Sequence, residues 1–162
     1  MSLLFAYCAG VIDSDGTIGV KRNTYSMRVV GDSVQPTYSE RVCVKQVEPQ
    51  AVRLLKRLFG GSFYLGKPQV ANGRPLWVWQ VTDLRAAACL RALLPFLRIK
   101  RRQAENCLRL REVKEESKRA RVAPGRGHAG AARRPAKLGT RMERFYVRAK
   151  QLNVVGRRKD AK

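Results

Sequence analysis

The chain has very little of the side chains on which most metal-free hydrolases depend. Its only histidine, His128, lies in a stretch rich in glycine and arginine. Its four cysteines, at positions 8, 43, 89 and 107, are scattered without any paired ligand spacing. Each lies in an apolar segment, so we expect buried free thiols. Any chemistry must therefore come from carboxylates, lysine or metal-bound water.

Long apolar runs are also missing. No run approaches the roughly 18 residues that a membrane-spanning helix needs. The N-terminus lacks the charged start and the cleavage site of a signal peptide. We therefore expect an intracellular protein, in the cytoplasm, the nucleoid or an organelle, that is not secreted and has no membrane partner.

Acidic residues are few. Twelve Asp and Glu face 34 Lys and Arg, which gives a formal net charge of +22. This exceeds what solubility requires and indicates a polyanion as partner. A solvated basic surface is the alternative, and a membrane surface is disfavoured because no basic amphipathic helix adjoins an anchor.

The hydrophobic periodicity predicts helix, two strands, helix, two strands and helix over residues 1–118. Helices are expected at 3–13, 49–59, 83–93 and 101–118, and strands at 17–30, 36–47, 62–70 and 75–82. Residues 119–162 form a basic linker and extension, with fourteen of the Lys and Arg residues and two acids. A short basic helix is expected within it at 138–152. Two alternatives remain for the extension: a disordered tail, or an arm that contacts DNA.

The predicted strands carry polar side chains at alternate positions, and arginine, lysine, asparagine and glutamine are the side chains that read base edges in a major groove. An ordinary solvated sheet face is the alternative. The expected DNA-contacting residues lie on these strands, in the Asn-Gly turn and after residue 97: Lys21, Asn23, Tyr25, Arg28, Ser39, Arg41, Lys45, Lys67, Gln69, Asn72, Arg74, Arg98, Arg101 and Arg102.

The most informative segment runs from Cys8 to Gly16 and ends in two carboxylates, Asp13 and Asp15, that bracket one serine. Both acids fall at a helix C-terminus, where the helix dipole disfavours anions. Divalent metal binding is the leading explanation. For Asp15 the alternative is an ordinary turn residue at the helix end, which is common for Asp-Gly.

This segment resembles the signature of the LAGLIDADG homing endonucleases, and it occurs once. Two further blocks are similar to that family: Val44-Lys45-Gln46 followed by Glu48-Pro49, and Pro95 to Lys100. The resemblance implies an α+β fold, an αββαββα core with a saddle-shaped antiparallel sheet, over residues 1–118. The basic extension lies outside the resemblance.

The resemblance also implies an activity: site-specific cleavage of double-stranded DNA by an intron-encoded enzyme that uses Mg²⁺ or Mn²⁺. The catalytic residues would be Asp15, Gln46 and Lys100, and the metal ligands Asp15 and the backbone carbonyl of Ser14. For Lys100 the alternative is neutralisation of a phosphate, and for Gln46 it is solvent contact at a strand end. The family's arginine after the second strand is absent, since the simplest register places Gln50 there, although Arg53 is near.

A single motif copy implies a homodimer through the motif helix and a roughly palindromic target. The interface residues would be Ala6, Ala9, Gly10 and Asp13, with Asp13 mainly bracing the helix end. Two rivals stay open: an RNA maturase or a non-cleaving nucleic-acid-binding relative, and a basic RNA protein of the ribosomal type. Binding of RNA is therefore also open.

Overall fold

A four-stranded antiparallel sheet forms the centre of the protein, and helices cover one of its faces. The computed structural model describes residues 2–23, 36–68, 73–120 and 135–154, and the backbone of residues 29–30 and 33–34. The elements are α1 (Ser2–Asp15), β1 (Gly16–Asn23), β2 (Val29–Val30), β3 (Ser33–Val34), β4 (Thr37–Gln46), α2 (Gln50–Phe59), β5 (Ser62–Leu65), β6 (Trp77–Thr82), α3 (Asp83–Leu93), α4 (Arg101–Arg119) and α5 (Ala136–Val154).

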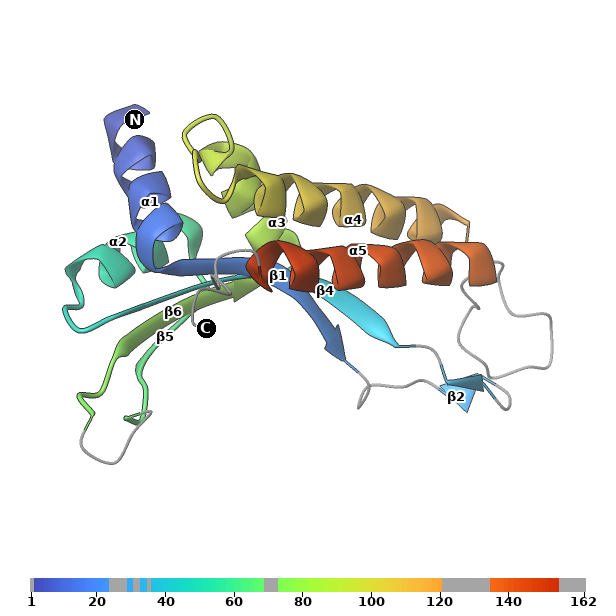
Figure 1. Ribbon diagram of the computed structural model, residues 1–162, viewed down its shortest axis with the longest axis horizontal. Coiled ribbons are helices and arrows are strands. Elements are labelled where there is room, and N and C mark those ends of the chain that lie inside the picture. The colour runs from blue at the N-terminus through green and yellow to red at the C-terminus, as the bar shows by residue number, and fades with distance from the viewer. Residues whose placement is uncertain are drawn as a thin grey trace, which may run out of the picture.

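The strand order in the main sheet is β1-β4-β6-β5, so the two hairpins join through β4 and β6. The strands β1 and β4 descend on one side of the molecule, and β5 and β6 descend on the other (Figure 1). The face that the helices leave uncovered is therefore arched. This confirms the predicted α+β fold and its saddle-shaped antiparallel sheet.

The predicted elements are all present; the helix at 83–93 has the predicted ends, and the ends of the others are shifted. The expected strand at 17–30 ends at Asn23, and residues 29–30 pair with 33–34 in a separate two-stranded sheet. The second hairpin has shorter strands than expected, 62–65 and 77–82. The Asn-Gly turn that was expected between them falls partly on residues outside the described ranges. None of the helices in the described part of the chain is long and apolar enough to cross a membrane.

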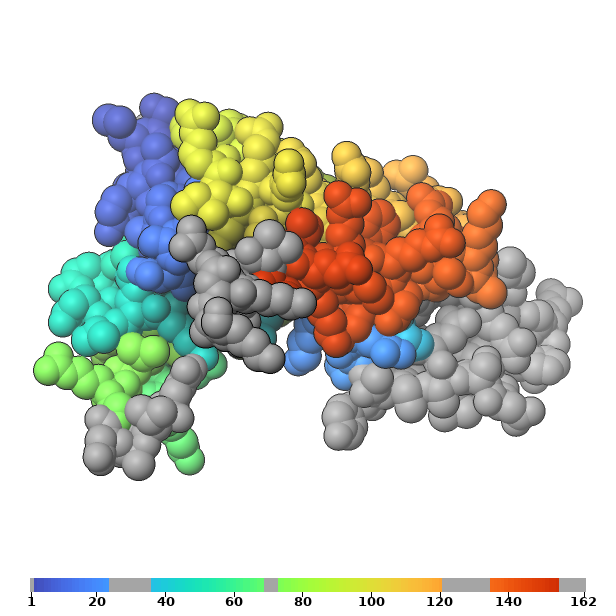
Figure 2. Space-filling model, in the orientation of Figure 1, coloured from blue at the N-terminus to red at the C-terminus, as the bar shows by residue number. Residues whose placement is uncertain are grey.

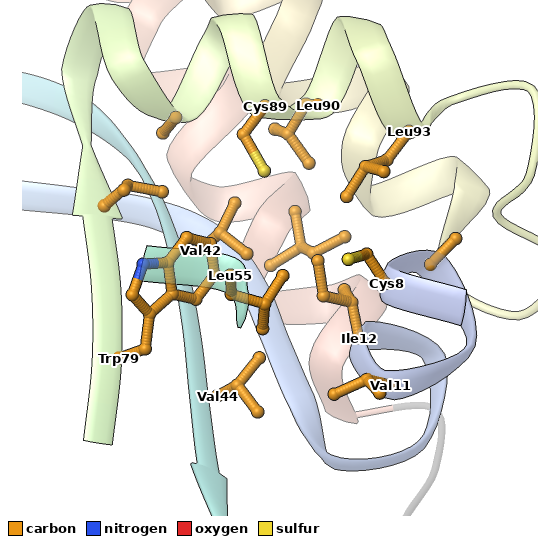
Figure 3. Packing of buried hydrophobic residues seen from close by; sticks show 14 of the residues in the cluster. Cys8, Val11, Ile12, Val42, Val44, Leu55, Trp79, Cys89, Leu90 and Leu93 are labelled. Atoms are coloured by element: carbon orange, nitrogen blue, oxygen red, sulfur yellow. The ribbon is translucent and has the colours of Figure 1, made fainter. Parts of the chain in front are cut away.

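The main core lies between the sheet and the helices α1, α2 and α3. Cys8 and Ile12 of α1 point toward Leu90 and Leu93 of α3 (Figure 3). Trp79 of β6 is fully buried, as expected for a core residue. All four cysteines are buried and free, which confirms the expectation from their apolar surroundings. Burial raises the pKa of the Cys107 thiol to about 12, with a further contribution from Glu40, so this thiol stays protonated and is no nucleophile.

The helix predicted at 138–152 exists and is longer, forming α5. Its Leu138 and Met142 pack with Leu110 and Val113 of α4 and with Tyr38 of the sheet. At its other end, Asn153 donates a hydrogen bond to the Ile18 carbonyl of the edge strand β1 (3.1 Å). The described part of the extension is thus a folded layer against α4 and β1. A DNA contact by the extension stays a prediction.

A buried ion network joins β4, α3 and α4. Glu40 in the middle of β4 is fully buried, and it accepts hydrogen bonds from Arg111 and Lys114 of α4. Both cations also bind Asp83, the first residue of α3, which adopts a positive φ of 57°. Burial alone would raise the pKa of Asp83, but its hydrogen bonds from Lys114 and Arg111 hold that pKa below the usual range. The network connects α3 and α4 to the middle of β4.

Candidate functional site

The helix α1 ends at the sheet, and a glycine makes this junction possible. The strand β1 starts at Gly16, directly after Asp15. A Cβ atom at Gly16 would lie 2.6 Å from the carbonyl oxygen of Ile12, so a side chain cannot fit here. The glycine that ends the acidic motif is therefore a structural requirement, and it fixes the two acids at the helix end.

Asp13 is a buried bracing residue. Its carboxylate is only 9% exposed and accepts three backbone N–H groups, from Arg98 (2.7 Å), Ile99 (3.2 Å) and Lys100 (2.8 Å). Hydrogen bonds to an ionised acceptor are stronger than neutral ones. Asp13 therefore fastens the segment before α4 to the end of α1.

Asp13→Asn should destabilise the protein by about 2–3 kcal/mol, because the amide replaces one acceptor oxygen by a donor and leaves a buried N–H without a partner. The free energy of unfolding in urea, measured without DNA or metal, checks this. Asp15→Asn makes the same chemical change at an exposed position and is the matched control. An equal loss in both variants would contradict a special bracing role for Asp13.

Lys100 reaches the last turn of α1 through its ammonium group. The Nζ atom donates to three carbonyl oxygens, of Ile12 (2.9 Å), Asp13 (2.6 Å) and Ser14 (3.2 Å). A cation at this end satisfies the unpaired carbonyls and the helix dipole. Burial lowers the pKa of Lys100 below its usual range, while Asp13 and Asp15 oppose that shift. In this structure Lys100 is thus a helix cap, with its ammonium close to both acids.

Asp15 is exposed and forms a pair with the predicted partner on β4. Gln46 donates from Nε2 to Oδ2 of Asp15 (2.8 Å), across 31 positions of sequence. The other carboxylate oxygen of Asp15 has no hydrogen bond among the described residues. The structure therefore brings Asp15, Gln46 and Lys100, the three predicted catalytic residues, together at one end of α1.

Arg53 lies close to this group by way of Trp77. The strand register pairs Trp77 with Gln46, so their side chains lie next to each other on the same face. The guanidinium of Arg53 lies over the Trp77 ring, 5.8 Å from its centroid, and Phe63 stacks on this ring at 5.0 Å. Trp77 itself is half-buried. Arg53 thus lies over the ring of the cross-strand neighbour of Gln46.

The donor set suits a hydrated hard cation. Mg²⁺ binds one or two carboxylates and keeps several waters. One exposed carboxylate, Asp15, and the neighbouring carbonyl of Ser14 match that requirement, although Lys100 shares this carbonyl. Within the described ranges no three His, Cys, Asp or Glu residues gather as a metal site. Asp15 and the Ser14 carbonyl are therefore the groups at this end of α1 that could hold such a cation.

The uncovered sheet face carries the predicted polar residues of β1 and β4. The register pairs Lys21 with Ser39, Asn23 with Thr37 and Gly19 with Arg41. Alternation places Lys21, Ser39 and Arg41 on the face opposite to the buried Ile18 and Val42. Arg41 donates to Gln80 of β6 (3.0 Å), a residue that was missed although its alternate position in 77–82 indicated it.

The other predicted contact residues are spread around this face or lie beyond the described part. Lys45, Lys67 and Arg74 are exposed on or next to the hairpins. Arg98 is exposed close to Asp13, and Arg101 forms an ion pair with Glu105 (3.1 Å). Arg102 lies in a groove between α4 and α5. Tyr25, Arg28, Gln69 and Asn72 fall outside the described residues.

The exposed face of α1 differs from the one predicted for the helix interface. Ala9 is fully buried and Asp13 is almost so, both within this chain, because they face α3 and the segment before α4. A partner helix therefore cannot contact Ala9, which corrects the prediction. Four of the exposed positions of α1 are Leu3 (86%), Ala6, Tyr7 (52%) and Gly10. They recur at helical spacing and form one stripe.

Comparison with known proteins adds to this geometry. No family model and no curated protein sequence matches the chain. Among solved structures, the homing endonuclease I-CvuI in complex with DNA superposes with a TM-score of 0.67 at 18% identity, over 99% of this chain and 85% of that chain. The archaeal intron-encoded homing endonuclease I-Vdi141I, complexed with DNA, gives a TM-score of 0.67 at 14% identity, over 99% and 90%.

The fold is that of the LAGLIDADG homing endonucleases. A third homing endonuclease, I-TnaI, matches with a TM-score of 0.53 at 15% identity over 94% of this chain and 97% of that chain. I-CvuI was solved in the presence of 2 mM Mg with its DNA not cleaved, and in the presence of 2 mM Ca. The alignments with I-CvuI and I-Vdi141I cover 99% of this chain, so they include the helix α5, which the sequence resemblance left out.

Proposed function

We propose that this protein is a metal-dependent, site-specific DNA endonuclease that acts as a homodimer. The observation that carries the proposal is the position of Asp15. It is an exposed carboxylate at the end of α1, bound to Gln46 and close to Lys100, next to an arched, basic sheet face. Structures with this fold at similar length have DNA bound, which supports DNA as the partner.

The chemistry follows from the charges at the site. Hydrolysis of a phosphodiester needs an activated water and stabilisation of negative charge on the phosphorus oxygens and on the leaving oxygen. A bound Mg²⁺ or Mn²⁺, held by Asp15 and the Ser14 carbonyl, supplies a polarised water and positive charge. Gln46 orients the Asp15 carboxylate by its hydrogen bond. Lys100 and Arg53 place fixed positive charge beside the scissile phosphate.

The homodimer is proposed because one chain offers one acid and one unpartnered helix face. The stripe of Leu3, Ala6, Tyr7 and Gly10 has a small-residue centre, and no atom lies within 4 Å of a Cβ built at Gly10. A second copy of α1 packed here would bring two Asp15 carboxylates to one place. The alignment with I-CvuI covers 99% of this chain and 85% of that chain, whereas the alignment with I-GzeII covers 88% of this chain and 42% of that chain. This chain therefore matches about half of I-GzeII, which supports pairing with a second copy.

Gly10→Glu should convert the dimer to a monomer, because the new carboxylate would be buried between two apolar helices. Gly139→Glu on α5 is a matched control, since a Cβ at Gly139 also meets open space. Sedimentation equilibrium measures the mass of each variant. The interface proposal fails if the wild type is monomeric at micromolar concentration with DNA, or if both variants dissociate alike.

Cleavage can be tested without knowing the target. The full chain would be incubated with Mg²⁺ and a library of random duplexes, and the ends of cut molecules would be sequenced. We expect cuts at one family of roughly palindromic sites, because a two-fold dimer reads two inverted half-sites. Tight and specific binding with no cutting under Mg²⁺ or Mn²⁺ would favour a non-cleaving relative or an RNA maturase.

Intracellular location and an intron-encoded origin also stay predictions.

A further inference from the structure

Three arginines gather in a groove between α4 and α5. The groove has a volume of about 150 Å³ and is lined by Arg102, Glu105, Asn106 and Arg109 of α4 and by Phe145 and Arg148 of α5. The two helices lie side by side along the molecule (Figure 2). Asn106 forms the floor, where it is 3% exposed and donates to the Phe145 carbonyl (2.9 Å). The groove is therefore a fixed feature of the packed helix pair.

The groove opens away from the sheet. Cys107 of α4 faces the sheet, since its thiol donates to the Gly19 carbonyl of β1 (3.4 Å). Residues two positions away along a helix are rotated by about 200°, so Glu105 and Arg109 point in the opposite direction. Arg102 lies one further turn along the same side as Glu105 and Arg109. Arg102 and Arg109 thus lie across the helix layer from the arched face on which the proposed target duplex would lie, and Arg148 lines the same groove.

Three arginines and one acid, Glu105, line the groove, so its lining has a net positive charge. Glu105 is bound by Arg101, Glu115 by Arg111 and Glu116 by Arg141. Arg102, Arg109 and Arg148 take part in no ion pair among the described residues. Three guanidinium groups around one small groove repel each other, and each presents several N–H donors. An anion in the groove would remove that repulsion and accept those hydrogen bonds.

We propose that the α4–α5 groove binds the phosphate backbone of a single-stranded nucleic acid, at a site separate from the endonuclease site. Arginine forks match phosphate geometry, and a basic groove beside an aromatic ring is the usual construction of single-strand sites. The volume of about 150 Å³ suits a single backbone phosphate, and the Phe145 ring offers a stacking surface for an unpaired base. Because a duplex on the arched face cannot pass through the helix layer, the strand in the groove is a second molecule or a displaced segment. Arg102 is thereby reassigned from the duplex to this groove.

Fluorescence anisotropy with labelled oligonucleotides of about 12 residues, oligo-U and oligo-dT, tests the site on the full chain saturated with unlabelled duplex DNA. The triple variant Arg102→Gln, Arg109→Gln, Arg148→Gln should bind oligo-U at least about tenfold more weakly. The slope of log affinity against log salt concentration should become less negative by about 2, because each lost phosphate contact removes about 0.7 from the size of that slope. Duplex affinity should change little.

A charge-matched control triple, Arg57→Gln, Arg91→Gln, Arg119→Gln, removes three exposed arginines elsewhere on α2, α3 and the end of α4. It should retain oligonucleotide binding within about threefold. Equal binding of RNA and DNA supports recognition of the backbone alone, and a preference for RNA supports a strand with 2′-hydroxyls. The proposal is overturned if duplex displaces the oligonucleotide, if the control loses as much affinity, or if neither oligonucleotide binds. These readouts use no cleavage, so they stand apart from the test of the endonuclease.

Discussion

Asp15→Asn should lower the rate of DNA cleavage by about 10³-fold or more, equivalent to at least about 4 kcal/mol of transition-state stabilisation. The substitution removes the negative charge that would hold the metal ion, while the amide oxygen can still accept from Gln46. Asp15 is exposed and lies outside the core, so the fold should persist. Cleavage rates under single turnover with Mg²⁺ and dissociation constants in Ca²⁺ measure the two effects separately.

The affinity of Asp15→Asn for duplex DNA should stay within a few fold of that of the wild type. The substitution removes one negative charge from a site that faces the negatively charged phosphates. Gln46→Leu is a milder variant for comparison. It removes the hydrogen bond to Asp15 and keeps the carboxylate, so it should lower the cleavage rate less than Asp15→Asn does. Retention of full cleavage by Asp15→Asn would refute the assignment of Asp15 as metal ligand. A parallel loss of binding would instead indicate a damaged interface.

Arg111→Met should destabilise the fold by about 3–5 kcal/mol, the largest effect on stability that we expect. The substitution leaves Glu40, which is fully buried, with Lys114 as its remaining charged partner. It also releases Asp83, whose positive φ is held in part by the same guanidinium. Urea unfolding at neutral pH measures the loss as a lower midpoint with an unchanged slope.

The double variant Arg111→Met, Glu40→Met distinguishes a buried charge from lost packing. It should recover much of the loss, because removing both partners leaves no uncompensated carboxylate in the core. Arg101→Met is a matched control, since its ion pair with Glu105 is about half exposed and should be worth less than about 1 kcal/mol. If the double variant is as unstable as Arg111→Met, the ion network is not the cause.

The order of the elements could be predicted because its signals are local. Helical spacing of apolar residues placed the helix now seen at 83–93 with both ends correct. Strand ends were less predictable, since β1 stops at Asn23 where its pairing with β4 ends, and pairing is a property of two distant segments. The expected contact with a partner at Ala9 was wrong for a similar reason. The sequence of an apolar helix such as α1 does not indicate which of its faces packs against the core of the same chain and which stays free for a partner.

The sequence by itself determined the basic character of the chain, the single acidic motif and the order of helices and strands. These follow from composition and from periodicities of two and 3.6 residues, which act over a few positions. Only the tertiary structure decided that Asp13 is buried under the backbone of residues 98–100 while Asp15 stays exposed for Gln46. The two carboxylates are two positions apart, so they point to different sides of the helix end. What each of them meets there depends on segments about 85 and 31 positions away, whose approach is set by packing of the whole core.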